Sequence, residues 1–317
     1  MSADLIPPLI SRAISGFANC DRSNAGFRDW LQTGTYTFLQ IDSDTFELQR
    51  VPTNDLLPTL AYDFWQVAFA CLESLCTRID FEKQPKSQGW RIIRQYYAAY
   101  FAAHALMRLL GQAATRLERA EAKRLAEIGT MYVGATANVE VSQYKISMTS
   151  IHKPECEIRF SKFDPSGTGD HQKFWRSFCN FLENLATDVA SRNDIDATNV
   201  VARIIEVTSA LKSNGYTNGG WLSNLRNVIN YQFQHGVWFP YNGYDKTDKI
   251  TDKRILSSGI RLDFDSKLKP ISLFDSLTQL ISSLCVEATA QIALMSPTDS
   301  DYVERWKSLY GIFEKQR

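Results

Sequence analysis

Residues 90–110 carry the clearest folding signal in this chain of 317 residues, and the signal is helical. The segment alternates bulky aromatic side chains with pairs of alanines. Gly111 follows it directly, and glycine is the residue that commonly ends a helix. Because the alanine pairs let another helix approach closely along one side, we predict a mainly α-helical chain in which this helix lies within a bundle.

Several other segments place apolar residues at helical spacing. The pattern predicts helices at 59–79, 112–128, 172–191, 197–212, 219–234 and 271–295, and a final amphipathic helix or turn at 302–315. Pro52 and Pro58 indicate a loop before the first of these helices. The bundle itself is expected to consist of 90–111, 172–191, 197–212, 219–235 and 271–295.

Two parts of the chain show the two-residue alternation of β-strands. Residues 36–41 and 45–51 flank Asp42-Ser43-Asp44 and predict a short hairpin. Residues 139–141, 144–148 and 155–163 predict a small antiparallel β insertion at about 131–171, with 164–170 as its closing loop.

A polar stretch at 82–89, which contains proline and glycine, is the best candidate for a domain boundary. We therefore expect an N-terminal α+β module at 1–83 and a helical domain, with the β insertion, at 84–317.

Charge, cysteine pattern and apolar content limit the classes of protein to which this chain can belong. The formal net charge is zero, so a nucleic-acid site would have to be a local basic patch. The six cysteines form no CxxC pair, the start lacks the features of a signal peptide, and no long uninterrupted apolar stretch exists. We expect a cytoplasmic protein that does not enter the membrane and that uses neither a metal ion nor a cofactor.

The most informative polar residues lie in the segment 225–240. Arg226 and Asn227 stand within an apolar helical pattern, and Tyr231 and His235 follow them. A guanidinium without a nearby acidic residue suits phosphate oxygens, and a phenol or imidazole can move a proton. The alternative for Arg226 is a structural bond to a carbonyl or a distant carboxylate. A lone histidine at a helix end, such as His235, more often caps carbonyls.

Residues 83–124 are rich in lysine and arginine. Arg91, Arg94 and Tyr97 follow one another at three-residue steps, which places them on one helix face as candidates for RNA binding. Trp238 could stack on a base. A solvated basic helix face and a closed aromatic core are the corresponding structural alternatives.

The aromatic and alanine-rich helix, followed by further helices and an Arg-Asn pair, resembles the HEPN superfamily (higher eukaryotes and prokaryotes nucleotide-binding). The resemblance covers roughly residues 84–295. It implies a helical bundle that forms a homodimer and, in many members, a metal-independent endoribonuclease of toxin–antitoxin or antiviral defence systems. The family motif is Arg, often Asn, and then His after four to six residues.

Arg226 and Asn227 match the first two motif positions, but Tyr231 occupies the position of the histidine, and His235 lies beyond the permitted gap. The resemblance implies that Arg226 binds the scissile phosphate and that Asn227 holds the motif helix. Tyr231 or His235 would then donate or orient a proton.

A second interpretation is that the chain has lost nuclease activity together with the motif histidine. Family members that lack it serve as binding or scaffold domains, so the chain would be an inactive interaction subunit. Its partner would be another protein, for which one encoded alongside it is the candidate.

Overall fold

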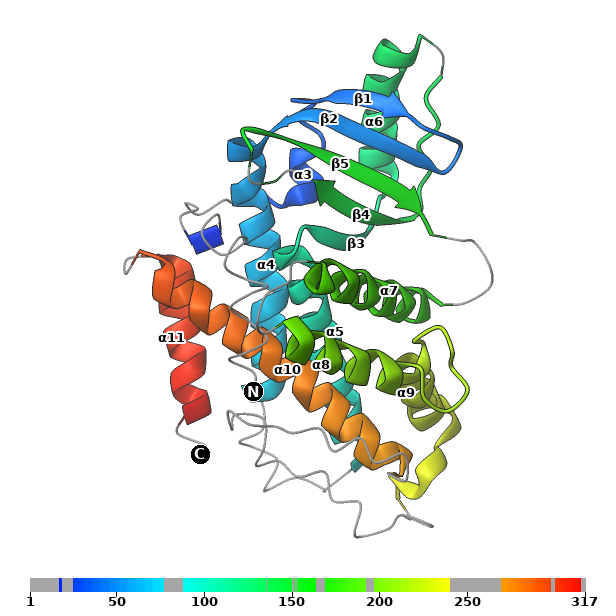
Figure 1. The fold of residues 1–317 in the computed structure, drawn as a ribbon, viewed down its shortest axis with the longest axis vertical. Helices are drawn as coiled ribbons and strands as arrows, with labels where there is room; N and C mark the ends of the chain where they lie inside the picture. The colour runs from blue at the N-terminus through cyan, green and yellow to red at the C-terminus, as the bar shows by residue number, and fades with distance from the viewer. Residues whose placement is uncertain are drawn as a thin grey trace.

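The computed structural model describes residues 17–18, 25–76, 88–134, 136–149, 151, 153–163, 169–191, 197–239, 269–297 and 300–314. Within these ranges the chain has nine α-helices and five β-strands, which confirms the prediction of a mainly helical protein with a small antiparallel β part. The sheet lies at one end of the long axis and most of the helices lie at the other (Figure 1).

The helices are α3 (Phe27–Trp30), α4 (Thr53–Cys76), α5 (Gln88–Leu109), α6 (Arg119–Val133), α7 (Asp170–Ala190), α8 (Ala197–Leu211), α9 (Trp221–Gln232), α10 (Pro270–Met295) and α11 (Asp301–Glu314). The strands are β1 (Thr37–Gln40), β2 (Thr45–Pro52), β3 (Gln112–Arg116), β4 (Gln143–Thr149) and β5 (Glu155–Lys162).

The two predicted β segments form one sheet. Its strand order is β1-β2-β5-β4-β3, and all neighbours are antiparallel. Phe46 of β2 pairs with Phe160 of β5, and their rings stack with centroids 4.6 Å apart. The N-terminal hairpin and the predicted insertion therefore share their hydrophobic face.

The expected helix at 112–128 is partly wrong. Gly111 ends α5 with a φ of +72°, and residues 112–116 then form the edge strand β3, in which Ala113 pairs with Ile146 of β4. The helix begins only at Arg119. Pairing with β4 supplies hydrogen bonds that the helical pattern of the sequence could not reveal. Residues 139–141, by contrast, form no strand.

The loop expected between Pro52 and Pro58 is also absent, because α4 begins at Thr53 and includes Pro58. A proline this close to the start of a helix removes one backbone hydrogen bond but leaves the later turns intact. The boundary predicted at residue 83 lies outside the described residues, as do the loop residues 164–168.

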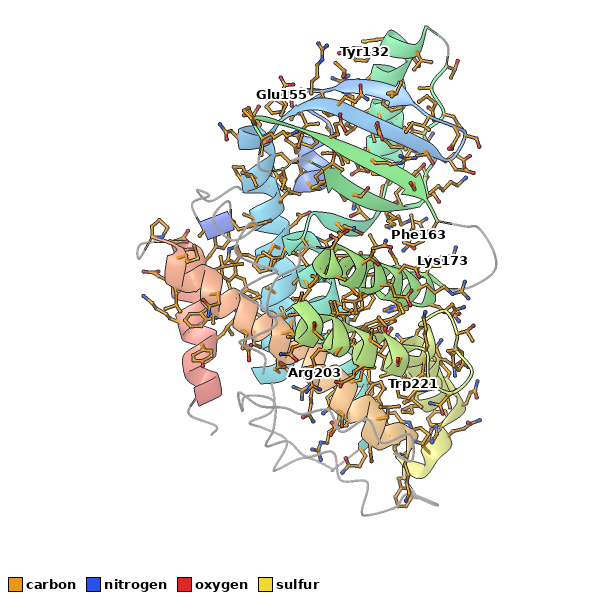
Figure 2. All side chains as sticks on the ribbon, viewed as in Figure 1. Tyr132, Glu155, Phe163, Lys173, Arg203 and Trp221 are labelled. Carbon is orange, nitrogen blue, oxygen red and sulfur yellow. The ribbon has the colours of Figure 1, made fainter. Side chains whose placement is uncertain are left out.

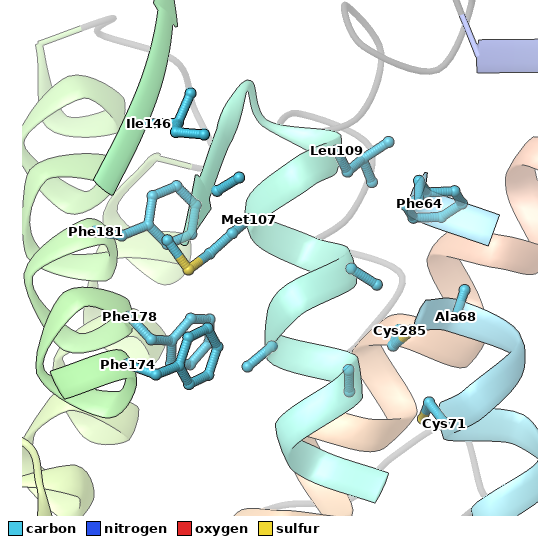
Figure 3. Packing of buried hydrophobic residues seen from close by; sticks show 14 of the residues in the cluster. Phe64, Ala68, Cys71, Met107, Leu109, Ile146, Phe174, Phe178, Phe181 and Cys285 are labelled. Atoms are coloured by element: carbon cyan, nitrogen blue, oxygen red, sulfur yellow. The ribbon is translucent and has the colours of Figure 1, made fainter. Parts of the chain in front are cut away.

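Helix α5 is the central element of the helical part. Its alanines at positions 98, 99, 102 and 103 are fully buried, which agrees with the close approach expected of them. Figure 3 shows α5 between α7 on one side and α4 with α10 on the other. Phe174, Phe178 and Phe181 of α7 face Met107 of α5 in this view.

Helix α10 is the one helix among those described that is long and apolar enough to cross a membrane. Most of its apolar stretch is buried, as in the core helix of a globular protein, so this is weak evidence for a membrane span. Four cysteines, Cys71, Cys156, Cys179 and Cys285, are buried free thiols.

Candidate phosphate-binding site

The candidate site lies where α5, α7 and α9 meet. We use the name Arg226 cluster for a group of five residues: Tyr96 and Tyr97 of α5, His171 of α7, and Arg226 and Asn227 of α9. In Figure 2, Lys173 on α7 and Trp221 on α9 lie on the same side of the helical part.

Helix α9 can approach α7 because a glycine precedes it. Gly219 has a φ of +84°, and a Cβ at this position would lie 2.5 Å from the Cβ of Cys179 on α7. A side chain here would therefore push the start of α9 away from α7. Leu222, Leu225 and Ile229 are buried, as the helical spacing predicted, and this stripe fixes the rotation of α9.

The guanidinium of Arg226 is held by neighbours from two helices. Its Nη1 donates to Oδ1 of Asn227 at 2.8 Å, and its Nη2 donates to the hydroxyl of Tyr97. The guanidinium carbon also lies 5.7, 5.4 and 5.6 Å from the ring centroids of Tyr96, Tyr97 and Tyr231, within the range of cation–π attraction. The charge is thus placed before any ligand arrives.

This guanidinium still has donors to offer. Of its five N–H groups, two make the bonds just described. The Nε atom is buried and has no hydrogen-bond partner among the described residues, so the donors left for a ligand are the second N–H groups of Nη1 and Nη2. Within that part of the chain no carboxylate acts on the charge of Arg226. Burial lowers the pKa of Arg226, but the Tyr97 bond and the adjacent phenols outweigh it and raise the pKa overall. Arg226 is therefore a cation at every physiological pH.

His171 joins this group from the first turn of α7. Its Nδ1 lies 2.9 Å from the hydroxyl of Tyr96, which also accepts a hydrogen bond from Nε1 of Trp175 at 3.0 Å. The imidazole stands 5.9 Å from the ring of Tyr97, centroid to centroid, and edge-on to it. Burial and, next, the charge of Arg226 lower the pKa of His171, against a smaller opposite effect of Asp170. His171 is therefore a neutral imidazole close to the permanent positive charge of Arg226.

The other two motif candidates lie toward the surface. Tyr231 is 66% exposed, so its ring contacts the guanidinium while one side faces solvent. Helix α9 ends when Phe233 adopts a left-handed backbone with a φ of 53°. His235 follows in a short 3-10 turn and is exposed, and no described hydrogen bond connects it to Arg226. The chain does not turn His235 back onto the guanidinium.

The remaining RNA-binding candidates make other contacts. Arg94 donates from Nη2 to the carbonyl of Ser74 on α4 at 3.0 Å, and Arg91 donates to Oε1 of Gln88 at 3.3 Å. Trp238 donates from Nε1 to the carbonyl of Ile229 at 2.8 Å and packs over Gly89. Of the predicted residues, the structure thus brings together Arg226, Asn227, Tyr231 and Tyr97.

A second histidine, His104 of α5, is part of the core next to this site. Its ring stacks on Phe174 with centroids 3.8 Å apart, and its Nδ1 lies 3.0 Å from Nη1 of Arg108. Burial, then the charges of Arg108 and His171, hold the pKa of His104 well below its usual value. These contacts make His104 a histidine of the core whose ring is held by packing and by Arg108.

Acidification is expected to destabilise the protein through His104. The unfolded chain binds a proton near pH 6.5 and the folded chain only at lower pH, so stability is complete above about pH 6.5 and is lost as the pH falls. We expect urea unfolding, followed by circular dichroism at pH 7, 6 and 5, to show a smaller loss in His104→Gln than in the wild type. An equal loss in both proteins would contradict this assignment.

The sequence patterns did not single out His171 as a functional residue. Nothing near it in the chain marks it, because polar residues precede it in the sequence and its partners come from α5 and α9. Tyr96 was visible only as one of several aromatic residues in the helix. Comparison with models of protein families, with curated proteins and with solved structures finds no match to this chain.

Proposed function

We propose that this chain is an RNA-directed protein of the HEPN type and that the Arg226 cluster binds the scissile phosphodiester for metal-independent cleavage. One observation supports the proposal above all: a cationic guanidinium is held in place by Tyr97 and Asn227 through one N–H of each Nη atom, and it has no carboxylate partner among the described residues. Such a group is complementary to a phosphate, which can accept two parallel hydrogen bonds from it.

The chemistry follows from what surrounds the guanidinium. A phosphodiester that replaces water at Arg226 would have the phenols of Tyr97 and Tyr231 close by. A preorganised cation stabilises the extra negative charge that develops on the phosphate oxygens as the 2′-hydroxyl attacks. The aromatic face of Tyr231, which is partly exposed, is suited to contact a neighbouring base.

The resemblance to HEPN proteins further supports a homodimer in which two Arg226 clusters share one cleft. Sedimentation equilibrium tests this part. If the protein is a monomer at micromolar concentration both with and without RNA, the homodimer is excluded.

The direct test is incubation of the purified protein with total RNA and a tRNA pool in the presence of EDTA. Cleavage products that end in a 2′,3′-cyclic phosphate and a 5′-hydroxyl are expected. Intact RNA after prolonged incubation at micromolar protein would oppose the nuclease and favour the second candidate.

That second candidate is a scaffold that docks a partner protein. One contact favours this alternative: the hydrogen bond from Arg226 to Tyr97 already joins α9 to α5 without any ligand. In this case Arg226→Ala would lower the melting temperature while RNA binding remains absent in both proteins. In the nuclease case the variant would lose RNA affinity.

A further inference from the structure

His171 and Arg226 lie on different helices but flank the same pair of tyrosines. The ring of Tyr96 is 5.7 Å from the guanidinium carbon of Arg226 and 5.7 Å from the imidazole of His171, measured to ring centroids. Tyr97 accepts a hydrogen bond from Arg226 and also packs against His171. A histidine is therefore present at the site in space, although the motif position in the sequence holds Tyr231.

The hydrogen bonds around Tyr96 orient this imidazole. Nε1 of Trp175 can only donate to the phenol oxygen, and it lies 3.0 Å from it. The phenol oxygen has two acceptor sites, which suit the N–H of Trp175 and an Nδ1–H of His171. The tautomer of a histidine is set by the bond that its other nitrogen makes, so Nε2 then carries the lone pair.

The surroundings favour the neutral form of His171. The groups that face it are Tyr96, Tyr97 and Tyr100 of α5, Arg226 of α9, and Asp170 on its own helix. Of these, Arg226 opposes protonation and Asp170 favours it, while burial adds to the effect of Arg226 and lowers the pKa. Nδ1 lies within hydrogen-bonding distance of Tyr96, no hydrogen bond of Nε2 joins it to the described residues, and the side chain is only partly buried.

We propose that His171 is the general base of the Arg226 site, supplied by α7 in place of the histidine that the α9 motif lacks. This inference rests on the proposed nuclease function. Nε2 takes the proton of the RNA 2′-hydroxyl, and the 2′-oxygen forms a bond to phosphorus. The bond from phosphorus to the 5′-oxygen breaks, and this oxygen takes a proton from water; the hydroxide that remains removes the proton from Nε2 and restores the neutral imidazole. The products are a 2′,3′-cyclic phosphate and a 5′-hydroxyl.

The test compares His171→Gln with Arg226→Ala and with the control His235→Gln, which changes an exposed histidine outside the cluster. Single-turnover cleavage by His171→Gln is expected to fall by about 100- to 10,000-fold, the usual contribution of a general base. Affinity for a 2′-O-methyl RNA, which cannot react, is expected to stay within about threefold in His171→Gln, because the phosphate is bound by Arg226. His235→Gln is expected to cleave like the wild type.

The pH profile separates a chemical role from a structural one. The wild-type rate is expected to rise with pH through a midpoint below 6.5, because the imidazole must be neutral, and this rise is expected to disappear in His171→Gln. Circular dichroism and melting temperature show whether the variant is folded.

Folded His171→Gln could cleave RNA at the wild-type rate or keep the wild-type pH profile while Arg226→Ala is inactive. Either result would overturn the assignment of His171 and leave the nuclease proposal standing. A wild-type protein that neither cleaves nor binds RNA would overturn both.

Discussion

Arg226→Ala is expected to reduce RNA cleavage by about 100- to 1,000-fold, the loss commonly seen when one preorganised donor to a developing oxyanion is removed. The variant loses the cation, its bonds to Tyr97 and Asn227, and its contacts with three aromatic rings. Affinity for a 2′-O-methyl RNA, measured by fluorescence anisotropy, is expected to fall as well, because the same group binds the phosphate.

Two further variants make this result specific. Arg226→Lys keeps the charge but loses the planar fork, so it is expected to bind RNA better than Arg226→Ala and to cleave less well than the wild type. Arg116→Ala is the matched control, since Arg116 is a half-exposed residue of β3 that pairs with Glu118. Cleavage by Arg226→Ala at the wild-type rate would exclude Arg226 from the chemistry.

Phe160→Ala is expected to lower the free energy of unfolding by about 3–5 kcal/mol, the usual cost of truncating a fully buried aromatic ring. Phe160 is fully buried on β5 and stacks on Phe46 of β2 and on Phe27 of α3. The variant loses these contacts and leaves a cavity that the surrounding side chains can fill only in part.

The same variant tests whether the sheet is one cooperative unit. Because β2 and β5 are paired, urea unfolding is expected to show a single transition that moves to lower urea for all probes of the sheet. Met131→Ala is the control, since Met131 is 79% exposed on α6 and its truncation should cost less than about 0.5 kcal/mol. A separate, unshifted transition of the N-terminal hairpin would contradict a shared sheet.

The regular elements could be predicted from the sequence because their signals are local. The aromatic and alanine pattern of α5, the alternation in β1, β2, β4 and β5, and the apolar stripe of α9 each repeat within a few residues. The placement of Arg226, Asn227 and Tyr231 on one helix followed directly from this periodicity.

Local patterns failed where contacts between distant segments decide the conformation. Residues 112–116 look helical by themselves, yet the free edge of β4 pairs with them and makes them a strand. The two β segments are far apart in the chain, and nothing in either one shows that β2 would pair with β5. That pairing is stabilised by the burial of side chains across the complete sheet.

For the candidate site, too, some features follow from local sequence and others from tertiary contacts. The sequence alone determined the mainly helical class, the hairpin, and the neighbouring positions of Arg226 and Asn227 on one helix, because these depend on spacing along the backbone. Only the tertiary structure decided that Tyr97 binds the guanidinium, that His171 joins it from α7, and that His235 does not. These outcomes depend on how three helices pack together, and packing is set by shape and burial across the whole core.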